Sequence, residues 1–345
     1  MPVEKNGKLR ITTNVAPVND VIEDFPYTLC PMEELFSACE GFFLVSIFDL
    51  EKGYFQVPLH PNSRKHFHTR WPGHGIVAWT VMVQGDKTAP GKFQYEMDKL
   101  VRRLNSSNRL SKNAAVIARL DDIAVFTKIK SSEAHLSDVK LLLEEFINNG
   151  WHGNQDKIKL FRTKVAWLGQ IISRNGILPQ PHKINKLHDL EITLKTPTQI
   201  RRFLGAVNEY RRFIKNLAEL AEPFYEALRE NGKVDEEKIR NSAKQIILHL
   251  EEAIPLKIAN TNNSFILETD ASDIGYGAVL NQDGIPIMFI SNNPKKLFNW
   301  RQRNTGYRTR GKETQILSIW KQSNCLHGSS AKCEFLEQKS LRNVK

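Results

Sequence analysis

The stretch that most constrains the fold is Val116–Phe126, which reads V-I-A-R-L-D-D-I-A-V-F. Two apolar runs rich in β-branched residues flank a short polar break, and this pattern predicts a β-hairpin with Asp121 and Asp122 at its tip. Neighbouring carboxylates repel each other and are poor core material, so their position at the end of a buried hairpin suggests a bound cation. An ordinary exposed turn is the alternative, because Asp is a common turn residue.

A third carboxylate strengthens the cation interpretation. The stretch Gly41–Leu59 reads G-F-F-L-V-S-I-F-D-L-E-K-G-Y-F-Q-V-P-L, and its apolar, strand-like run ends at Asp49. That carboxylate is expected at the end of a strand, where acids from separate segments can converge. Three acids can hold two Mg²⁺ ions roughly 3.5–4 Å apart, which activate an attacking oxygen and neutralise a departing one. Such chemistry is that of nucleotide polymerisation.

The Asp49 stretch and the R-L-D-D of residues 119–122 resemble the palm of a reverse transcriptase, in particular that of gypsy-type LTR retrotransposons. Further blocks follow in the order of that family and extend the resemblance over nearly the whole chain. They are V-Q-G-D-K-T-A-P-G-K-F-Q (Val83–Gln94), W-L-G-Q (Trp167–Gln170), T-P-T-Q-I-R-R-F-L-G-A-V-N-E-Y-R-R-F-I (Thr196–Ile214) and E-T-D-A-S-D-I-G-Y-G-A-V-L (Glu268–Leu280).

The resemblance implies an α+β right-hand polymerase of fingers, palm and thumb, followed by a truncated ribonuclease H-like α/β domain. The expected domains are residues 1–177 for fingers and palm, 178–255 for a helical thumb or connection, and 262–345 for a partial ribonuclease H-like domain. The length of 345 residues is enough for two or three domains, each with its own core.

Composition bounds the partners and the compartment. Lys and Arg number 49 against 38 Asp and Glu, a net charge of +11, which favours a polyanionic partner; a merely soluble basic protein is the alternative. The four cysteines form no C-x-x-C pair, so neither a zinc site nor a disulfide framework is indicated. The sequence shows neither a signal peptide nor an apolar run of membrane-spanning length. We therefore expect a soluble intracellular protein, in the cytoplasm or the nucleus, with no membrane partner and an undetermined oligomeric state.

The resemblance also implies residues that bind the incoming nucleotide. Lys5 and Arg10 match by position the basic fingers residues that grip its triphosphate. Tyr54 matches the aromatic that packs beneath the sugar and excludes a ribose 2′-hydroxyl. Gln84 and Gly85 match contacts to the nucleotide and the template. The alternatives are a flexible basic terminus for the first pair and an ordinary buried aromatic for Tyr54.

A second group of residues is implied to bind nucleic acid. Arg119 stands where the family nearly always has an aromatic, and an arginine there can still reach a primer phosphate. The W-L-G of residues 167–169 resembles the segment that grips the primer. Residues 198–217 are predicted as one helix whose basic stripe tracks a duplex backbone, with a plain solvated face as the alternative. The full set is Arg119, Trp167, Gly169, Arg201, Arg212 and Lys215. Lys157 and Lys159 are interpreted as surface lysines, although one of them could give a proton to departing pyrophosphate.

The last hundred residues resemble the start of a ribonuclease H domain. Asp270 lies in its expected opening strand, Glu313 at an expected helix start, and Glu337 replaces a usual Asp. By the resemblance these three are catalytic, and Asp270 and Glu313 also bind metal. A fourth acid is missing before Lys345, so two-metal cleavage of RNA is expected to be impaired.

Local patterns predict several elements. Asn6 and Gly7 predict a short hairpin, the apolar spacing from Pro90 predicts a helix, and residues 131–150 predict an amphipathic helix with Ser at its start and Gly at its end. The segment I-L-P-Q-P-H-K after Gly176 is interpreted as a Pro-rich joint. Residues 231–244 are interpreted as a charged linker.

The function expected from the resemblance is that of an RNA-directed DNA polymerase of a retrotransposon, a nucleotidyltransferase with possible residual ribonuclease H endonuclease (hydrolase) activity. With two Mg²⁺ or Mn²⁺ ions held by Asp49, Asp121 and Asp122, a primer 3′-hydroxyl would attack a deoxynucleoside triphosphate on an RNA or DNA template. A decayed or repurposed copy that binds nucleic acid without catalysis is the alternative. Arg119 and Glu337 favour it, as do Asn14 and Ala16, which stand where the family usually has an acid and an arginine. A host structural protein without a nucleic-acid role is a third interpretation.

Overall fold

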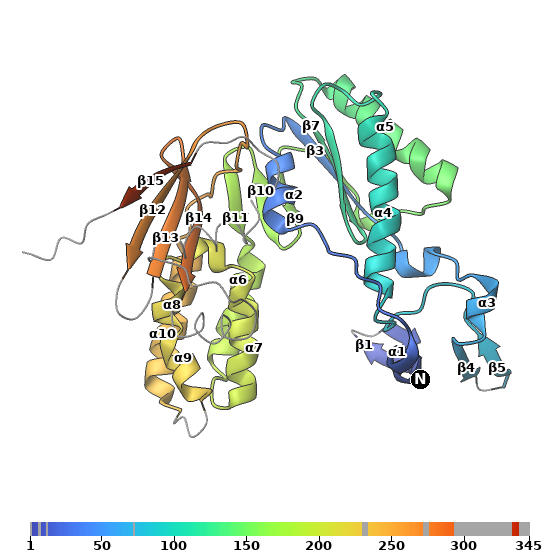
Figure 1. The fold of residues 1–345 in the computed structure, drawn as a ribbon, viewed down its shortest axis with the longest axis horizontal. Coiled ribbons are helices and arrows are strands. Elements are labelled where there is room, and N and C mark those ends of the chain that lie inside the picture. Colours follow the sequence, from blue (N-terminus) through green and yellow to red (C-terminus); the bar gives the residue numbers. More distant parts are fainter. Residues whose placement is uncertain are drawn as a thin grey trace, which may run out of the picture. The chain divides into compact units, whose positions relative to one another are not determined.

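The computed structural model describes residues 2–5, 8–11, 13–71, 73–229, 234–271, 276–292 and 333–337. The chain divides into two compact units, Met1–Leu35 with Gly41–Thr163 and Phe36–Glu40 with Lys164–Lys345 (Figure 1). Each unit combines helices with mainly antiparallel sheets, which confirms the predicted α+β class. The predicted boundary at residue 177 falls inside a strand of the second unit, and the three-domain division stays a prediction.

A four-stranded antiparallel sheet forms the centre of the first unit. Its strand order is β6-β7-β3-β8, with β3 at Leu44–Asp49, β6 at Ala115–Arg119, β7 at Asp122–Thr127 and β8 at Lys159–Arg162. Helices α4 (Ala89–Ser106) and α5 (Ser132–Asn149) lie along one face of this sheet (Figure 1), and their apolar side chains pack against it. The opposite face carries the odd-numbered positions of β3, because side chains alternate along a strand.

Both helices were predicted from sequence and are confirmed. Phe93, Met97 and Leu100 of α4 are completely buried, as their helical spacing requires. At the start of α5 the Ser131 hydroxyl accepts a hydrogen bond from the Ala134 N–H at 3.1 Å. The helix ends at Gly150, whose φ of 71° is the left-handed conformation that favours glycine.

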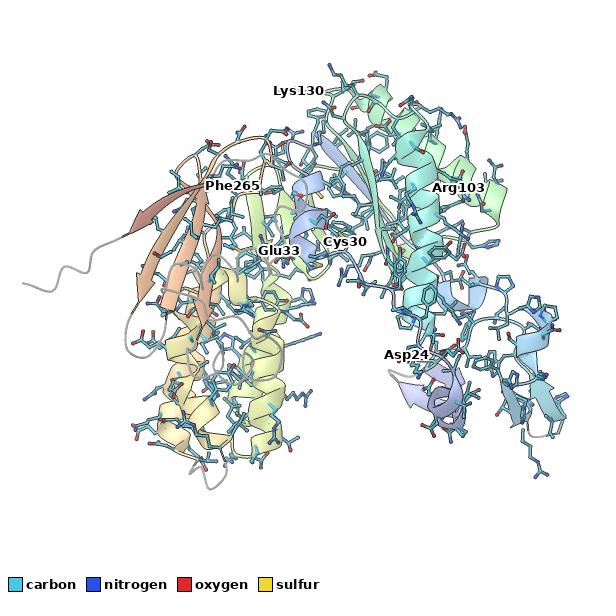
Figure 2. All side chains as sticks on the ribbon, in the orientation of Figure 1. Asp24, Cys30, Glu33, Arg103, Lys130 and Phe265 are labelled. Carbon is cyan, nitrogen blue, oxygen red and sulfur yellow. The ribbon has the colours of Figure 1, made fainter. Side chains whose placement is uncertain are left out.

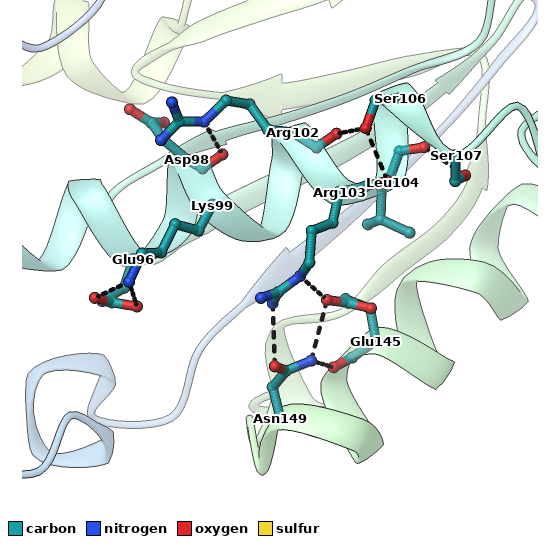
Figure 3. Close-up of polar contacts among 10 residues, drawn as sticks. All are labelled: Glu96, Asp98, Lys99, Arg102, Arg103, Leu104, Ser106, Ser107, Glu145 and Asn149. Carbon is teal, nitrogen blue, oxygen red and sulfur yellow. Dashed lines mark hydrogen bonds and ion pairs between the residues drawn. The ribbon is translucent and has the colours of Figure 1, made fainter.

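Figure 3 shows the polar contacts that join Arg103 of α4 to Glu145 and Asn149 of α5. Arg103 of α4 donates to a Glu145 carboxylate oxygen at 2.5 Å and to Asn149 Oδ1 at 3.1 Å. Because the Arg103 side chain is half exposed, such a pair contributes about 0–1 kcal/mol. The apolar contacts beneath α4 and α5 therefore dominate the packing.

One buried polar network fastens α5 to the sheet. His135 Nδ1 lies 2.7 Å from Thr127 Oγ1, and His135 Nε2 lies 2.7 Å from Ser46 Oγ. The Thr127 hydroxyl donates to Asp138, so it accepts from an Nδ1–H, and Ser46 donates to the unprotonated Nε2. Burial lowers the pKa of His135 and keeps it neutral. Ser46 is on β3 and Thr127 on β7, so the network holds these two strands against the helix.

Smaller elements complete the first unit. The hairpin predicted around Asn6–Gly7 is confirmed, since β1 and β2 pair with Pro2 opposite Ile11. The elements are β1 (Pro2–Lys5), β2 (Lys8–Ile11), α1 (Ala16–Val21), η1 (Gly53–Gln56), α3 (Pro61–Arg64), β4 (His68–Trp71), β5 (Gly75–Ala78) and η2 (Gln155–Lys157). Helix α2 (Met32–Ala38) contains residues of both units.

The second unit begins with a three-stranded sheet of order β11-β10-β9. Its strands are β9 (Lys164–Trp167), β10 (Gln170–Ser173) and β11 (Gly176–Pro179). The interpretation of the segment after Gly176 as a joint was wrong, because Ile177 exchanges two backbone hydrogen bonds with Leu256 at 2.8 and 2.9 Å. At the terminal position of β11, Pro179 is tolerated.

Helices follow this sheet. They are α6 (Pro181–Glu191), α7 (Pro197–Asn208), η3 (Arg211–Phe213), α8 (Leu217–Leu220), α9 (Glu222–Ala227) and α10 (Glu236–Glu251). The single helix predicted over 198–217 was wrong, because the chain breaks after Asn208 and turns both Tyr210 and Phe213 into the core. The linker predicted over 231–244 was wrong in its second half, because Asp235 caps α10 and Ile239 and Ala243 are buried.

The C-terminal sheet has the order β14-β13-β12-β15. Its strands are β12 (Phe265–Ala271), β13 (Tyr276–Gln282), β14 (Ile285–Asn292) and β15 (Cys333–Glu337). Strand β12, whose first residue Phe265 is labelled in Figure 2, pairs antiparallel with β13 and parallel with β15. Among the described residues, no helix has the length and apolar character needed to cross a bilayer.

Candidate active site

The predicted hairpin is confirmed, with one difference in its turn. Strands β6 and β7 pair up to Arg119 opposite Asp122, so the turn consists of Leu120 and Asp121, and Asp122 is the first residue of β7. Leu120 has a φ of 52°, a left-handed conformation that non-glycine residues seldom adopt. The short turn leaves Asp121 at the tip of the hairpin.

The structure brings the three predicted aspartates to one end of the sheet. Asp49 is the last residue of β3 and lies directly opposite Asp122 of β7. The Leu50 N–H donates to the Asp121 carbonyl at 3.0 Å, which ties the hairpin tip to the end of β3. Residues opposite each other in an antiparallel pair have Cβ atoms about 4.5–5.5 Å apart. Asp49 and Asp122 therefore share the sheet face opposite α4 and α5.

The charges at this sheet end are coupled. The pKa of Asp122 is raised to about 6, mainly by burial and also by the neighbouring charges of Asp121 and Asp49, while Lys157 and Lys159 oppose the shift. Lys157 Nζ lies 2.8 and 3.0 Å from the two carboxylate oxygens of Asp49. The hydrogen bond to Asp49 is the largest cause of the raised pKa of Lys157. The protonation states of Asp122 and Lys157 thus depend on the neighbouring charges of this cluster.

Lys157 is a functional candidate that the sequence reasoning placed on the surface. Its partner Asp49 is distant in the chain, and the contact arises because the segment after α5 returns to the end of β3, where the Asn154 N–H donates to the Asp49 carbonyl at 2.7 Å. The only sequence signal is a lysine in a short polar segment just after a helix. Such a signal does not distinguish this lysine from Lys159.

The donor set suits a hard divalent cation, although its side chains are not gathered into a ligand cage. Within the ranges that the structure describes, no group of three His, Cys, Asp or Glu side chains is arranged to hold a metal ion. The chemistry of the residues nevertheless fits such an ion. Burial and the two neighbouring carboxylates make an ionised Asp122 unfavourable, and a bound cation would offset this repulsion. Carboxylate oxygens are also the ligands that Mg²⁺ prefers. Lys157 neutralises Asp49 in this arrangement.

Tyr54 lies beside the acids. It belongs to η1 and its ring stacks on Phe93 with the centroids 5.0 Å apart. Burial is the main cause of its raised pKa, and the charge of Asp121 adds to it. A Cβ on the preceding Gly53 would lie 2.8 Å from Phe93 Cζ and 3.5 Å from Asp121 Cβ. A glycine is therefore required for this close approach.

The Gln84–Gly85 loop is shaped by residues that the sequence reasoning did not single out. Gly85 has a φ of 98°, and the exposed Gln84 precedes it. The side chain of Asn19 donates to the Gly85 carbonyl at 2.9 Å and accepts from the Lys87 N–H at 2.9 Å. Asp86 accepts from the N–H and the hydroxyl of Thr88 at the start of α4. Asn19, from a distant segment, and Asp86, from the loop itself, thus fix the loop's backbone.

Of the remaining nucleotide-binding candidates, only the backbone is described. Lys5 lies opposite Lys8 and Arg10 opposite Val3 in the β1–β2 hairpin. Their side chains lie outside the part of the chain that the structure describes. The triphosphate role predicted for both stays a prediction.

Arg119 has a definite partner within the first unit. Its Nη1 donates to the Cys30 carbonyl at 2.6 Å, and Cys30, labelled in Figure 2, immediately precedes Pro31 and α2. Arg119 lies opposite Asp122 in the β6–β7 register. The arginine side chain therefore extends from the sheet face that carries Asp49 and Asp122 toward the segment before α2.

Trp167, which was predicted to bind nucleic acid, has a buried side chain, so its ring cannot contact a primer directly. Its side chain is only 2% exposed and makes an edge-to-face contact with Phe36 at 6.2 Å, so the ring belongs to the core of the second unit. Leu168 and Gly169 form the two-residue turn from β9 to β10, with φ values of 47° and 80°. The Gly169 carbonyl accepts from the Tyr210 hydroxyl at 3.3 Å. Within the W-L-G segment, Leu168 and Gly169 are partly exposed, and Trp167 is buried.

Among the basic residues of the helical region, Arg201 and Lys215 are exposed as predicted. Arg212 was wrongly placed on the same exposed stripe. It is only 7% exposed, it donates to the Ile287 carbonyl of β14 at 3.3 Å, and its guanidinium lies 5.4 Å from the centre of the Phe36 ring. The break after α7 turns Arg212 inward, so its guanidinium anchors the C-terminal sheet.

The predicted ribonuclease H acids are described only in part. Asp270 lies in β12 opposite Gly277 of β13. Glu337 ends β15 opposite Thr269, the residue before Asp270, so the backbone brings these two positions onto neighbouring parallel strands. Glu313 lies outside the described residues.

Two family profiles match this chain. One, described as reverse transcriptase (RNA-dependent DNA polymerase), covers residues 3–172, and the other, described as an RNase H-like domain found in reverse transcriptase, covers residues 236–306. The chain is 30% identical over 290 residues to the retrovirus-related Pol polyprotein from transposon 297 of Drosophila melanogaster. It is 28% identical over 280 residues to the transposon Tf2-3 polyprotein of Schizosaccharomyces pombe.

These alignments cover 83% and 81% of this chain but only 26% and 20% of the polyproteins, so the chain spans about a quarter of their length or less. Solved structures share the fold. A foamy viral protease-reverse transcriptase in complex with an RNA/DNA hybrid has a TM-score of 0.74 at 18% identity, covering 100% of this chain and 50% of the viral one. A foamy viral protease-reverse transcriptase dRH with double-stranded DNA has a TM-score of 0.75 at 18% identity, covering 99% and 65%.

Proposed function

The chain belongs to the reverse transcriptase family, with an associated RNase H-like domain and homology to LTR retrotransposon polyproteins, and we propose that it is the RNA-directed DNA polymerase of a gypsy-type element. The observation that carries the proposal is the convergence of Asp49, Asp121 and Asp122 at one sheet end. The reaction proposed is attack of a primer 3′-hydroxyl on the α-phosphorus of a deoxynucleoside triphosphate.

The three aspartates would hold two divalent ions, Mg²⁺ or Mn²⁺. When bound, such ions activate the attacking oxygen and neutralise charge on the departing one. The carboxylates must be ionised to bind metal, so Asp122, with its pKa near 6, is the member most sensitive to acid. Lys157 holds the Asp49 carboxylate at the end of β3 and carries a proton close to the site.

Nucleotide selection is proposed for the residues around the acids. Tyr54 is held rigidly by its stacking on Phe93, so its ring can act as a fixed floor beneath a sugar and exclude a 2′-hydroxyl. Gln84 is exposed on a loop whose backbone is fixed by Asn19. Lys5 and Arg10 would bind the triphosphate from the β1–β2 hairpin.

Template and primer binding is proposed for exposed cations. Arg201 and Lys215 are free to meet phosphates at the surface, and each phosphate that they neutralise steepens the salt dependence of binding. The foamy viral proteins of similar fold were solved in complex with double-stranded DNA and with an RNA/DNA hybrid, which supports such duplexes as ligands of this chain. Gly169 and Arg119 complete the proposed contacts.

The polymerase proposal is tested by primer extension on an RNA template with Mg²⁺. The unmodified protein should add nucleotides, and Asp121→Asn should slow incorporation by a factor of about 10³ or more, by analogy with other electrostatic contributions. Asp156→Asn removes an exposed acid of η2 and serves as the control. Undiminished extension by Asp121→Asn would refute the assignment of that residue.

A binding-only copy is the second candidate. The observation that favours it is the ion pair between Lys157 and Asp49, where a metal ligand is expected. This candidate predicts that the unmodified protein binds a hybrid tightly, with a steep salt dependence, but adds no nucleotide even with Mn²⁺.

An RNase H activity is proposed only in impaired form. Asp270 and Glu337 lie on neighbouring parallel strands, which supports a shared site, and Glu313 would supply the third acid. Hydrolysis of the RNA strand in a hybrid should be slow, and Asp270→Asn should abolish what remains.

A further inference from the structure

The side-chain amide of Gln94 holds the turn that carries the acids. Gln94 belongs to α4 and is only 3% exposed. Its Oε1 accepts from the Leu120 N–H at 2.7 Å, and its Nε2 donates to the Ala118 carbonyl at 3.1 Å. One amide therefore bonds to the backbone of β6 and to the first residue of the turn.

The orientation of this amide is fixed by further contacts. Gln94 Nε2 also donates to Asp98 Oδ1 at 2.7 Å, and the other carboxylate oxygen of Asp98 accepts from the Tyr27 hydroxyl. Asp98 and the Ala118 carbonyl accept hydrogen bonds, whereas the Leu120 N–H donates one. Only one of the two amide orientations satisfies all three groups, so Gln94 is locked in place.

The turn needs such support. Leu120 adopts a φ of 52°, a strained backbone conformation for a non-glycine residue that persists only where the surroundings enforce it. Asp121 follows immediately, and its carbonyl accepts the hydrogen bond that ties the hairpin to Leu50. Any relaxation of Leu120 would therefore move Asp121 and the first residue of β7, Asp122.

We propose that Gln94 is a positioning residue for Asp121 and Asp122, a role that rests on the proposed polymerase function. It sets the backbone of the turn from the helix side of the sheet, and it touches neither substrate nor metal. A purely structural role, in which the amide only satisfies two buried backbone groups, is the competing explanation.

The same helix offers a matched control. Asn105 of α4 bonds to β6 in the same way, because its Nδ2 donates to the Val116 carbonyl at 2.9 Å and its Oδ1 accepts from the Val116 N–H at 3.0 Å. Val116 lies near the start of β6, away from the turn. Asn105→Leu therefore removes two hydrogen bonds to the backbone of β6 without releasing Leu120, although Asn105 is exposed and Gln94 is buried.

The test compares Gln94→Met and Asn105→Leu with the unmodified full-length chain. Single-turnover incorporation of a deoxynucleotide on a primed RNA template should slow on the order of 10²-fold in Gln94→Met, the effect expected from a misplacement of about 1 Å. The Mg²⁺ concentration for half-maximal rate should rise, and amide exchange at residues 119–122 should accelerate. Asn105→Leu should lower the melting temperature while keeping the rate and the Mg²⁺ dependence.

Several outcomes overturn the inference. If Gln94→Met keeps the unmodified rate and Mg²⁺ dependence, or if Asn105→Leu slows incorporation equally, Gln94 is only structural. These results leave the polymerase proposal intact, because the unmodified protein still extends the primer. Failure of the unmodified protein to extend overturns the proposed function, and the positioning role with it.

Discussion

Replacement of Asp122 by Asn should stabilise the metal-free protein while abolishing primer extension. Burial and the charges of Asp121 and Asp49 raise the pKa of Asp122 from 3.8 to about 6, so an ionised Asp122 destabilises the folded state relative to the unfolded state. One pKa unit corresponds to about 1.4 kcal/mol, which sets a limit of about 3 kcal/mol for the gain. The side chain is partly open to water, and screening reduces the expected gain to about 1–2 kcal/mol.

The sign of this effect depends on pH. A carboxyl group whose pKa is raised by folding binds its proton more tightly in the folded state, so its penalty is present above pH 6 and disappears as the pH falls through 6 toward 4. In EDTA at pH 7.5, Asp122→Asn should raise the melting temperature of the first unit by about 3–6 °C. At pH 4.5 this increase should shrink to about a third, because the folded state is then protonated while the unfolded state is still mostly ionised.

The control for this prediction is Asp156→Asn, which removes the exposed acid of η2 and should leave the melting temperature unchanged at both pH values. An Asp122→Asn variant that is no more stable than the unmodified protein at pH 7.5 would refute the electrostatic reasoning. Equal stabilisation at both pH values would do the same, because it would show that the effect does not come from the charge.

Three further predictions concern neighbouring groups. Lys157→Met should change stability by less than about 1 kcal/mol, since the lysine is largely exposed, but it should slow incorporation and lower the Mg²⁺ concentration for half-maximal rate, measured by Mg²⁺ titration. Gly53→Ala should cost about 1–3 kcal/mol and reduce discrimination against ribonucleotides, measured as a ratio of incorporation efficiencies, because its Cβ would displace Phe93 beneath Tyr54. Burial lowers the pKa of His135, so the unfolded state binds the proton at a higher pH than the folded state does. The free energy of unfolding should therefore fall as the pH drops below about 6.5. Denaturant titrations at several pH values should show this fall, and His135→Gln should lack the contribution of this residue to it.

The elements that sequence predicted well are those with a local cause. The helix after Pro90 follows from apolar spacing, and α5 follows from Ser131 and Gly150 at its two ends. The hairpin follows from two β-branched runs around a polar break. Each signal lies within the element that it specifies, and the periodicity of apolar residues is enough to find it.

The sequence predictions failed for polar side chains whose hydrogen-bond partners lie in distant segments of the chain. Arg212 has the spacing of an exposed helical stripe, but the chain breaks after Asn208, and Arg212 then lies against β14. Gln94 has no charge and no motif of its own, and its importance depends on the unusual φ of Leu120. Neither the break nor that backbone conformation has a sequence signature.

Arg119 bears directly on the choice between an active and a decayed polymerase. In the hairpin register it lies opposite Asp122, yet its guanidinium extends to the Cys30 carbonyl, which is a neutral acceptor. Decay of the site would predict an ion pair between this arginine and an acid, because an arginine paired with a carboxylate would compete with metal ions for that ligand. The register of the acids is kept instead, and the arginine ties the segment before α2 to the hairpin.

Arg119→Tyr, which restores the aromatic of the family, should therefore extend a primer at a rate within about tenfold of the unmodified protein, a change of roughly 1.4 kcal/mol in the barrier. Incorporation that appears only in Arg119→Tyr would show that the arginine inactivates this copy.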